Sequence, residues 1–503
     1  MPPGRETSGD VRWPRTTALY KGNRSQRWSS EESAGLIVPL EGWDNTTQPE
    51  GRSPTSVTGV QCRGGGFDCR MARNKTPTVR QLQRTLYRKA KQDKAVKFYS
   101  LYDKVWREDV LWEAWQQVKA NHGAPGVDGV TIEEIVDQGQ EAAMMGRLAE
   151  QLRAKTYRFQ PVRRVDIPKP KGGTRPLGIA VVEDRVGQTA MKLVLEPIFE
   201  ADFHDCSYGY RPHRDAKMAS EPLRADLARG AWAVVEIDFQ SYFLTIPHSK
   251  LLRLIRQRVR DGSMLGLIKH SLKAGVLYQG QITPTTEGVP QGSPIAPLYS
   301  NISLNLLDQV WHSRGYPTML GATLHRYADD AILVCRRNAE QALHAFEAIV
   351  ARMDLIINRT KTRITKVTEG FDYLGFHFVR RRSPTSGKRH IYIFPSKAGQ
   401  RSIRRRIKSF TKRRAPVPPE AFVRQINAAV EGGVHYYRHT NASQAFRALQ
   451  RFINTRFRRY LTYRRQGRGF GWKQYPNRRL YALGITHIGS GRIRYPRAPA
   501  HAL

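Results

Sequence analysis

Three acidic residues stand in or beside apolar segments, where a lone carboxylate is difficult to bury. Asp238 ends the run 231–237, and Asp329 and Asp330 lie within the apolar segment 324–335. Burying an unpaired carboxylate is costly, and a bound cation offsets that cost. Hard divalent ions such as Mg²⁺ prefer carboxylate oxygens, and a pair of them supports phosphoryl transfer. The three acids therefore predict a metal-dependent phosphoryl-transfer site.

The same residues admit a plainer interpretation. Acidic pairs are common in hairpin turns, and an Asp at a strand end can act as a cap. The segment Tyr327-Ala328-Asp329-Asp330 by itself does not separate a metal site from a turn. The surrounding segments have to decide between the two.

Each acid lies in a segment whose pattern predicts a β-strand. Residues 232–239 read as a strand in which an acid ends an apolar run, and residues 324–335 read as a second strand with Asp329 and Asp330 at its middle. Between them we expect a basic amphipathic helix around 249–260, a turn-rich segment at 288–294 and a helix through 298–310. Neighbouring strands would bring the acids together.

The N-terminal part is predicted to be basic and largely helical. Residues 1–70 are rich in Gly, Ser, Thr, Pro and Arg without a period, which indicates a flexible extension, with Met71 as an alternative start. Residues 76–119 predict two basic helices and residues 121–129 a loop. Farther along, residues 162–182 predict a hairpin with a basic tip.

Charge and composition limit the partner and the compartment. The 83 Lys and Arg against 43 Asp and Glu give a formal charge of +40, which points to a polyanion such as nucleic acid or to a merely solvated basic surface. Four cysteines without C-x-x-C spacing or paired histidines indicate neither a zinc site nor disulfides. Because no apolar run is long enough to span a membrane and no signal pattern begins the chain, we expect a soluble intracellular protein.

After Asp372 the only acids are Glu420 and Glu431, while arginines crowd two helical stretches, 402–412 and 444–465. Aromatic residues are interleaved with them, which suits RNA, because rings stack on bases while guanidinium groups hold phosphates. The alternative is an amphipathic pattern in which the rings form the core and the arginines the solvated face. We expect the rings to be mainly core and the basic residues to be mainly RNA-binding: Arg404, Arg405, Arg406, Lys408, Arg456, Arg458 and Arg459.

In combination these segments resemble the reverse transcriptases encoded by group II introns, the intron maturases. The family's blocks appear in order at 121–129, 163–186, 195–212, 236–248, 288–297, 327–330, 358–362 and 373–376. Segments 425–427, 432–438 and 446–463 resemble the family's thumb or X domain, with Gly433 where Trp is frequent. Motifs in their expected order are a more specific signal than any one of them.

The resemblance implies an α+β fold, the right-hand polymerase, with an antiparallel palm sheet carrying the catalytic aspartates and an α-helical thumb. The implied domains are a flexible extension at 1–70, fingers at 71–225, a palm at 226–380 and a thumb with a basic tail at 381–503. The family's endonuclease module is expected to be missing, because the residues after the helical region contain no Cys and few His.

The resemblance also implies the metal site. Asp238 and Asp329 would hold two Mg²⁺ ions, or Mn²⁺ in their place. Asp330 would be a further ligand or support, and the Phe239 carbonyl an additional ligand. Lys361 would protonate the leaving pyrophosphate as a general acid.

Four other residues are implied to bind the incoming deoxynucleoside triphosphate. Lys169 and Arg175 would hold its phosphates, because cations at a fingertip suit a triphosphate. Phe243 would exclude a ribose 2′-hydroxyl by steric clash, and Gln291 would contact the nucleotide or the template. Ordinary core packing for the Phe and a surface location for the Gln are the plainer alternatives.

The function implied is that of an RNA-directed DNA polymerase that binds group II intron RNA, assists its splicing and copies it into cDNA during retrohoming. Its partners would be intron RNA, an RNA template with a DNA primer or target, and dNTPs, without a membrane, in a cytoplasmic ribonucleoprotein or an organelle. Two alternatives are a reverse transcriptase of a retron, diversity-generating, CRISPR-linked or defence system, and a splicing factor with a vestigial palm. Gln240 and Leu244 depart from the family's usual Lys and Asp, although the metal ligands are intact.

Overall fold

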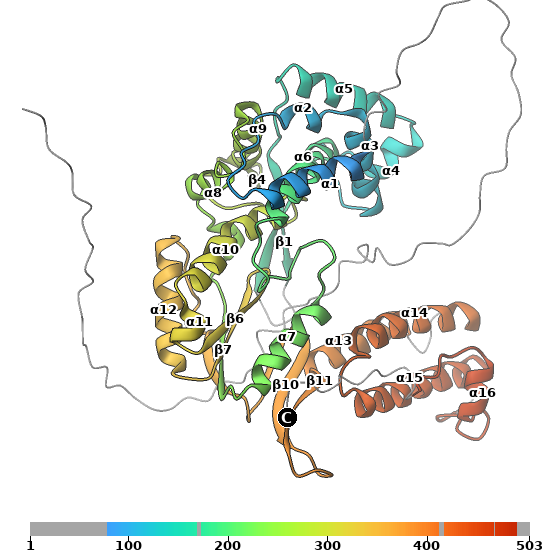
Figure 1. The fold of residues 1–503 in the computed structure, drawn as a ribbon. Coiled ribbons are helices and arrows are strands. Elements are labelled where there is room, and N and C mark those ends of the chain that lie inside the picture. Colours follow the sequence, from blue (N-terminus) through green and yellow to red (C-terminus); the bar gives the residue numbers. More distant parts are fainter. Residues whose placement is uncertain (1–77, 169–172, 412–416, 467, 490–503) are drawn as a thin grey trace, which may run out of the picture.

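The structure is a computed structural model that describes residues 78–168, 173–411, 417–466 and 468–489 (Figure 1). The extension expected at 1–70, the alternative start Met71 and the fingertip residue Lys169 lie outside the described residues. The mixture of helices with three small sheets confirms the α+β fold expected from the sequence.

The N-terminal helices pack around one buried helix, α6 (Val182–Glu200). Helix α1 (Val79–Gln92) begins at Thr78 with a capping box, in which Thr78 and Gln81 satisfy each other's backbone N–H groups. Its apolar residues recur every three or four positions and are buried, whereas its Lys and Arg face outward. The two helices expected over 76–119 are present as α1 and α3 (Glu108–Ala120), with the short α2 (Tyr102–Val105) between them. Only α1 is basic; the expected basic character of the second helix is wrong, because α3 carries Glu108, Asp109 and Glu113 against Lys119 alone.

Two more helices complete this part, α4 (Ile132–Asp137) and α5 (Glu141–Arg153). The hairpin expected at 162–182 is formed by β1 (Val162–Pro168) and β2 (Thr174–Ile179). It is extended by β4 (Val276–Tyr278), parallel to β1, and then β5 (Gln281–Thr283), in the order β2-β1-β4-β5.

The central sheet has the order β6-β7-β3-β8 and is antiparallel throughout. Its strands are β3 (Ala233–Ile237), β6 (Ala322–Tyr327), β7 (Asp330–Cys335) and β8 (Arg363–Lys366). The single strand expected over 324–335 is wrong, because the chain reverses at Ala328 and Asp329 to make a hairpin. Ala328 adopts φ 56°, a left-handed conformation that lets Tyr327 pair with Asp330.

Helices cover both faces of the central sheet, which explains why its strands read as continuous apolar runs. Ala233, Val235 and Ile237 join the core shared with the N-terminal helices, whereas Val234 joins the core shared with the C-terminal part. The helices that contact this sheet are α7 (Ala216–Ala228), α11 (Tyr316–Met319) and α12 (Ala339–Arg352), and the 3₁₀ turn η1 (Tyr242–Leu244) follows β3. Helix α10 (Ala296–Ser313) packs on α11 and α12, and α8 (His248–Ile255) links it to α9 (Gly262–Leu272), which lies beside the N-terminal helices (Figure 1).

The C-terminal part begins with a three-stranded sheet made of β9 (Phe371–Tyr373), β10 (Phe376–Arg382) and β11 (Arg389–Pro395). Helices α13 (Lys397–Phe410), α14 (Pro419–Tyr437), α15 (Ser443–Arg464) and α16 (Asn477–Ala482) follow and lie together to one side of the β10–β11 hairpin (Figure 1). The rings of Phe376 and Tyr436 stack at a centroid distance of 5.0 Å, which ties this sheet to α14. None of the helices in the described residues is long and apolar enough to cross a membrane.

Candidate catalytic site and nucleic-acid surface

The three predicted carboxylates come together at one end of the central sheet. The register pairs Ile237 with Ala331 and Tyr327 with Asp330, so Asp238 follows β3 beside the β6–β7 turn. The charge of Asp238 acts on both Asp329 and Asp330, and the charge of Asp329 acts on Asp330. The expectation that neighbouring strands unite these acids is confirmed.

Their proximity carries an electrostatic cost. Removal from water, followed by repulsion from Asp329 and Asp238, raises the pKa of Asp330 from 3.8 to about 7, although its side chain retains access to solvent. Burial also raises the pKa of Asp329. Divalent cations relieve this repulsion, and three carboxylates are the hard oxygen donors that Mg²⁺ prefers. The arrangement therefore fits the metal site expected from the sequence.

Glu236 lies on β3 and Asp238 directly follows that strand, and the two carboxylates differ in how fully protein groups bind them. Both oxygens of Glu236 accept hydrogen bonds from Arg363 at 2.8 Å, and Thr365 adds a third at 2.9 Å. Asp238 instead lies 3.4 Å from the Lys361 ammonium group, an ion pair without a closer hydrogen bond. Its carboxylate is thus less fully engaged by protein donors than that of Glu236.

The backbone around Asp238 is held by the segment that follows α12. The Asn358 N–H donates to the Asp238 carbonyl at 2.7 Å, and the Asp238 N–H donates to the Thr362 hydroxyl at 3.3 Å. Lys361 belongs to the same short segment, so its ammonium is delivered to Asp238 by local structure. The expected general acid and the expected metal ligand are therefore neighbours.

The β6–β7 turn is fixed by a buried ion pair that sequence reasoning missed. Arg326 and Asp308 are both fully buried and joined by several hydrogen bonds, the shortest 2.5 Å. The same guanidinium donates to the Ala328 carbonyl at 2.8 Å and to Asn301 at 3.1 Å. Arg326 thus holds the turn through the Ala328 carbonyl. The sequence signal for this buried ion pair was a cation directly before Tyr327 in an apolar strand.

A second support comes from the segment between α6 and α7. The Tyr208 N–H donates to the Arg326 carbonyl at 2.9 Å, and Asn301 donates to the Gly209 carbonyl at 2.8 Å. A Cβ on Gly209 would lie 2.3 Å from the Ala328 nitrogen, so only glycine permits this approach. Tyr210 follows, and loss of solvent and then the Asp329 charge raise its pKa to about 12. The Tyr210 phenol therefore lies near the acids, and the sequence did not single it out.

Two of the predicted nucleotide-binding residues meet. Arg175 donates to the Gln291 side chain at 2.9 Å, although they lie on β2 and on the turn-rich segment before α10. The backbones dock as well, because the Gly178 N–H donates to the Gln291 carbonyl at 2.7 Å. Arg175 also acts on Asp329 and Asp330 through its charge, so the fingertip strand reaches the carboxylates.

The two predicted phenylalanines are largely buried. The Phe239 ring packs against Tyr242 and Phe346, at centroid distances of 5.5 and 6.3 Å. Phe243 lies in η1 directly after the Asp238 segment, and its carbonyl accepts a 2.6 Å hydrogen bond from the Val289 N–H. Its core packing is therefore clear, and its role as a steric gate remains a prediction.

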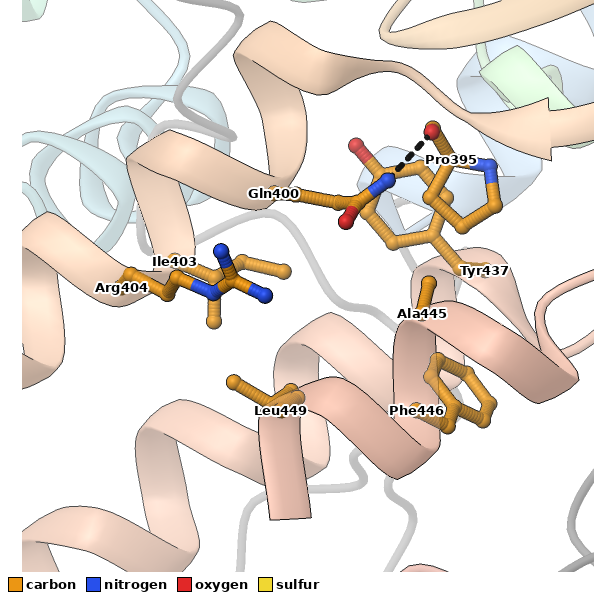
Figure 2. A pocket seen from close by; sticks show the side chains of 8 residues that line it. All are labelled: Pro395, Gln400, Ile403, Arg404, Tyr437, Ala445, Phe446 and Leu449. Atoms are coloured by element: carbon orange, nitrogen blue, oxygen red, sulfur yellow. Dashed lines mark hydrogen bonds between the residues drawn. The ribbon is translucent and has the colours of Figure 1, made fainter. Parts of the chain in front are cut away.

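The basic residues expected to bind RNA divide between α13 and α15. Arg405, Arg406, Lys408 and Arg459 are exposed, whereas Arg404 is half-buried. Between these helices is a small pocket, into which the side chains of Ile403, Tyr437 and Leu449 project (Figure 2); it is lined by Pro395, Gln400, Ile403, Arg404, Tyr437, Ala445, Phe446 and Leu449. The aromatic rings are mostly core, as expected, whereas Arg405, Arg406, Lys408 and Arg459, together called the basic ridge, are exposed on the two helices.

Arg458 requires a correction. Its side chain is buried, donates to the Tyr475 carbonyl and the Asn477 side chain at 2.7 Å each, and lies over the Trp472 ring at 3.8 Å. Arg456 is half-buried and donates to Thr411. Helical periodicity did not distinguish these positions, because Arg458 turns inward to hold the segment that follows α15. Arg458 is therefore not available to contact RNA.

Two family models match the chain. The reverse transcriptase (RNA-dependent DNA polymerase) family matches residues 167–378, which include all three carboxylates. The group II intron, maturase-specific domain matches residues 400–479, which include the basic helices. The first match covers the part of the fold that contains the three aspartates, and the second covers the part that contains the exposed arginines.

Several curated proteins are similar. Protein YkfC of Escherichia coli is 33% identical over 355 residues, which cover 63% of this chain and 92% of that protein. The group II intron-encoded protein LtrA of Lactococcus lactis is 35% identical over 213 residues, 42% of this chain and 35% of that protein. A putative COX1/OXI3 intron 2 protein of Saccharomyces cerevisiae is 30% identical over 203 residues, 40% of this chain and 23% of that protein. The matched region thus spans about a third or less of the latter two.

We predict that Asp308→Asn strongly destabilises the protein. The substitution keeps the shape but leaves the buried Arg326 charge uncompensated, which costs about 3 kcal/mol or more of unfolding free energy. Chemical denaturation measures this loss. Asp103→Asn, which breaks the exposed pair with Lys104, is the control and should change the free energy by less than about 1 kcal/mol. Equal losses in the two variants would contradict this role of the Arg326–Asp308 ion pair.

We also predict that Asp330→Asn stabilises the metal-free protein at high pH. Since the folded pKa of Asp330 is raised to about 7, the carboxyl ionises first in the unfolded chain, and stability falls as the pH rises from about 4 to about 7. In a chelating buffer the variant should have a modestly higher Tm at pH 8 and a smaller gain at pH 5.5, since solvent screens part of the repulsion at this exposed residue. Added Mg²⁺ should reduce the difference, and Asp354→Asn serves as the control. A gain independent of pH would refute the repulsion.

Proposed function

The chain belongs to the reverse transcriptases encoded by group II introns, and from that premise we propose that it binds an intron RNA, assists its splicing and copies it into DNA by two-metal phosphoryl transfer. The reverse transcriptase family match and the group II intron-encoded relatives support RNA-directed DNA polymerase activity. The single observation that carries the mechanism is the meeting of Asp238, Asp329 and Asp330 at the end of the central sheet.

In this proposal Asp238 and Asp329 hold the ions, with Asp330 as a further ligand or support. Two Mg²⁺ ions bound there would lower the pKa of the primer 3′-hydroxyl and neutralise the charge that develops on pyrophosphate. The Phe239 carbonyl is a proposed additional ligand. The hydrogen bond from Arg326 to the Ala328 carbonyl keeps the turn in place. Misplaced carboxylates would lose the alignment of the reacting oxygens.

The fingertip strand provides the triphosphate contacts. Arg175, already close to the carboxylates, would bind phosphate oxygens bidentately, with Lys169 as a second cation. Gln291 would contact the nucleotide or template from the other side of Arg175. Lys361, at 3.4 Å from Asp238, has the reach needed to donate a proton to the leaving pyrophosphate.

Phe243 is the proposed gate against ribonucleotides. Its backbone is held by Val289 and its ring is wedged against Tyr242 at 5.5 Å, so the ring has little room to retreat. A rigid ring rejects an additional hydroxyl by clash more effectively than a mobile one. Its position five residues after Asp238 supports this role.

The basic ridge of α13 and α15 is the proposed contact for structured RNA. The match to the maturase-specific domain covers both helices, and Arg405, Arg406, Lys408 and Arg459 are exposed there. Phosphate contacts of this kind give affinity and position without reading bases. The recognition of a particular intron would then come from the shape of the RNA.

For the polymerase activity, we expect Asp329→Asn to lower the rate of primer extension on an RNA template by at least about 1000-fold, because a metal ligand supplies several kcal/mol to the transition state. The assay uses the full chain, a DNA primer, dNTPs and Mg²⁺. Asp354→Asn is the matched control, since Asp354 is an exposed carboxylate paired with Lys250. RNA affinity should be unchanged in both variants, and an active Asp329→Asn enzyme would refute the site.

For RNA binding, we expect the affinity to fall linearly with salt on a log–log plot, through release of counterions from RNA. The double variant Arg405→Gln/Lys408→Gln should lower the slope by about 1 to 2 and weaken binding to the intron transcript that flanks the reading frame. Splicing of that transcript should weaken with it.

The matched control is Arg229→Gln/Arg314→Gln, which removes two exposed cations elsewhere. Asp329→Asn should retain splicing assistance, which separates the RNA-binding task from polymerisation. A salt slope unaffected by the α13 substitutions would contradict the basic ridge.

A further inference from the structure

Two histidines and a cysteine meet beside the strand that leads to the catalytic turn. His204 and Cys206 lie between α6 and α7, and His312 lies in the last turn of α10. One ligand atom from each residue lies within 4.8 Å of the others, and the two imidazole rings stack at a centroid distance of 3.6 Å. Nothing in the proposed polymerase reaction uses these side chains.

Hydrogen bonds define which ring nitrogen of each histidine carries the lone pair. The His312 Nδ1 must donate to the Asp308 carbonyl at 2.8 Å, which leaves its Nε2 with a lone pair. A histidine ligand that donates its other N–H to a carbonyl is the usual arrangement at metal sites. The His204 Nδ1 must carry a lone pair because it accepts the Cys206 N–H, at the long distance of 3.2 Å. A metal ion can compete for that lone pair.

The donor set also suits a metal. His204 and His312 each offer an imidazole nitrogen, and Cys206, whose side chain is buried, offers a sulfur that binds zinc as the thiolate. Two imidazoles and a thiolate are borderline-soft donors, which favour Zn²⁺ over the Mg²⁺ expected at the carboxylates.

We propose that His204, Cys206 and His312 bind one Zn²⁺ ion, with a water molecule in the fourth position. Binding breaks the Cys206 S–H bond, releases the proton to solvent and forms the sulfur–zinc bond, while both imidazoles remain neutral. Tetrahedral zinc separates its N and S ligands by roughly 3.3–3.6 Å, given bond lengths of about 2.0–2.3 Å. The ligand atoms, which lie within 4.8 Å of one another, therefore have to approach by roughly 1 Å, and the stacked rings have to turn so that both lone pairs point at one ion.

The bound ion would fasten the 204–207 segment to α10. That segment already supports the catalytic strand, because the Arg326 N–H donates to the Cys206 carbonyl at 2.8 Å. It is held from other sides by Arg211, which donates to the His204 carbonyl at 2.8 Å, and by Asn305, which accepts the His204 N–H at 3.1 Å. The backbone of the site is thus fixed before any ion binds. Spacing in the sequence did not reveal it, because His312 comes from a distant helix.

The test uses the full chain with Cys62→Ser and Cys69→Ser, so that Cys206 and Cys335 are its remaining thiols. After removal of metals, Zn²⁺ is titrated in excess Mg²⁺, and the bound zinc is counted by mass spectrometry of the metal. We expect about one ion per chain and a Tm raised by roughly 5 °C at saturating zinc. With Co²⁺ as the probe, a near-ultraviolet thiolate-to-metal charge-transfer band should appear.

Cys206→Ser should abolish that band, and both Cys206→Ser and His312→Gln should weaken zinc binding at least about tenfold. Cys335→Ser, which removes the other buried thiol, and Asp329→Asn, which alters the carboxylate site, should bind zinc like the parent. The proposal is overturned if the folded parent gives no thiolate band, or if Cys206→Ser or His312→Gln retains the parent's zinc affinity. The parent spectrum decides the matter even if a variant does not fold.

Discussion

The structure depends on holding three carboxylates together against their mutual repulsion. Asp238 directly follows β3, and Asp329 and Asp330 lie at the turn into the adjacent β7; burial and then this repulsion raise the pKa of Asp330 to about 7. A free loop would relax away from this repulsion, whereas these positions are tied to the ends of paired strands, whose hydrogen-bonded register would have to break. The buried Arg326–Asp308 pair then fixes the turn itself through the Ala328 carbonyl. The paired strands thus keep the three carboxylates close together, and bound divalent ions would neutralise their negative charge.

This acidic centre sits in a strongly basic protein. A formal charge of +40 would attract a polyanion to the surface, while the concentrated negative site within it would attract divalent ions. The two fields serve different tasks, and they are separated along the chain: the acids lie in the reverse transcriptase match and the exposed cations of α13 and α15 in the maturase match. The proposed splicing assistance and the polymerisation should therefore be separable by substitution.

Close backbone contacts join the segments around the site. Gly209 approaches Ala328 so closely that no side chain fits, and Gly178 and Gly292 allow the fingertip hairpin to dock on the Gln291 segment. Because the backbones touch directly in such contacts, the position of one segment fixes the position of the next, with no flexible side chain between them. The Cys206 segment is part of the same frame, which is why a zinc ion there would bear on the catalytic strand.

The sequence by itself determined the α+β class, the acids, the basic hairpin and the Arg-rich helices, because periodicity and apolar runs record which faces are buried. It left open whether Asp329 lies in a hairpin turn, because a turn made by Ala328 at φ 56° leaves no glycine or proline as a signal. Nor did it show that Arg458 points inward while Arg459 points outward. The Arg326–Asp308 pair and the meeting of His204, Cys206 and His312 were decided only by the tertiary structure, since packing alone brings distant segments into contact.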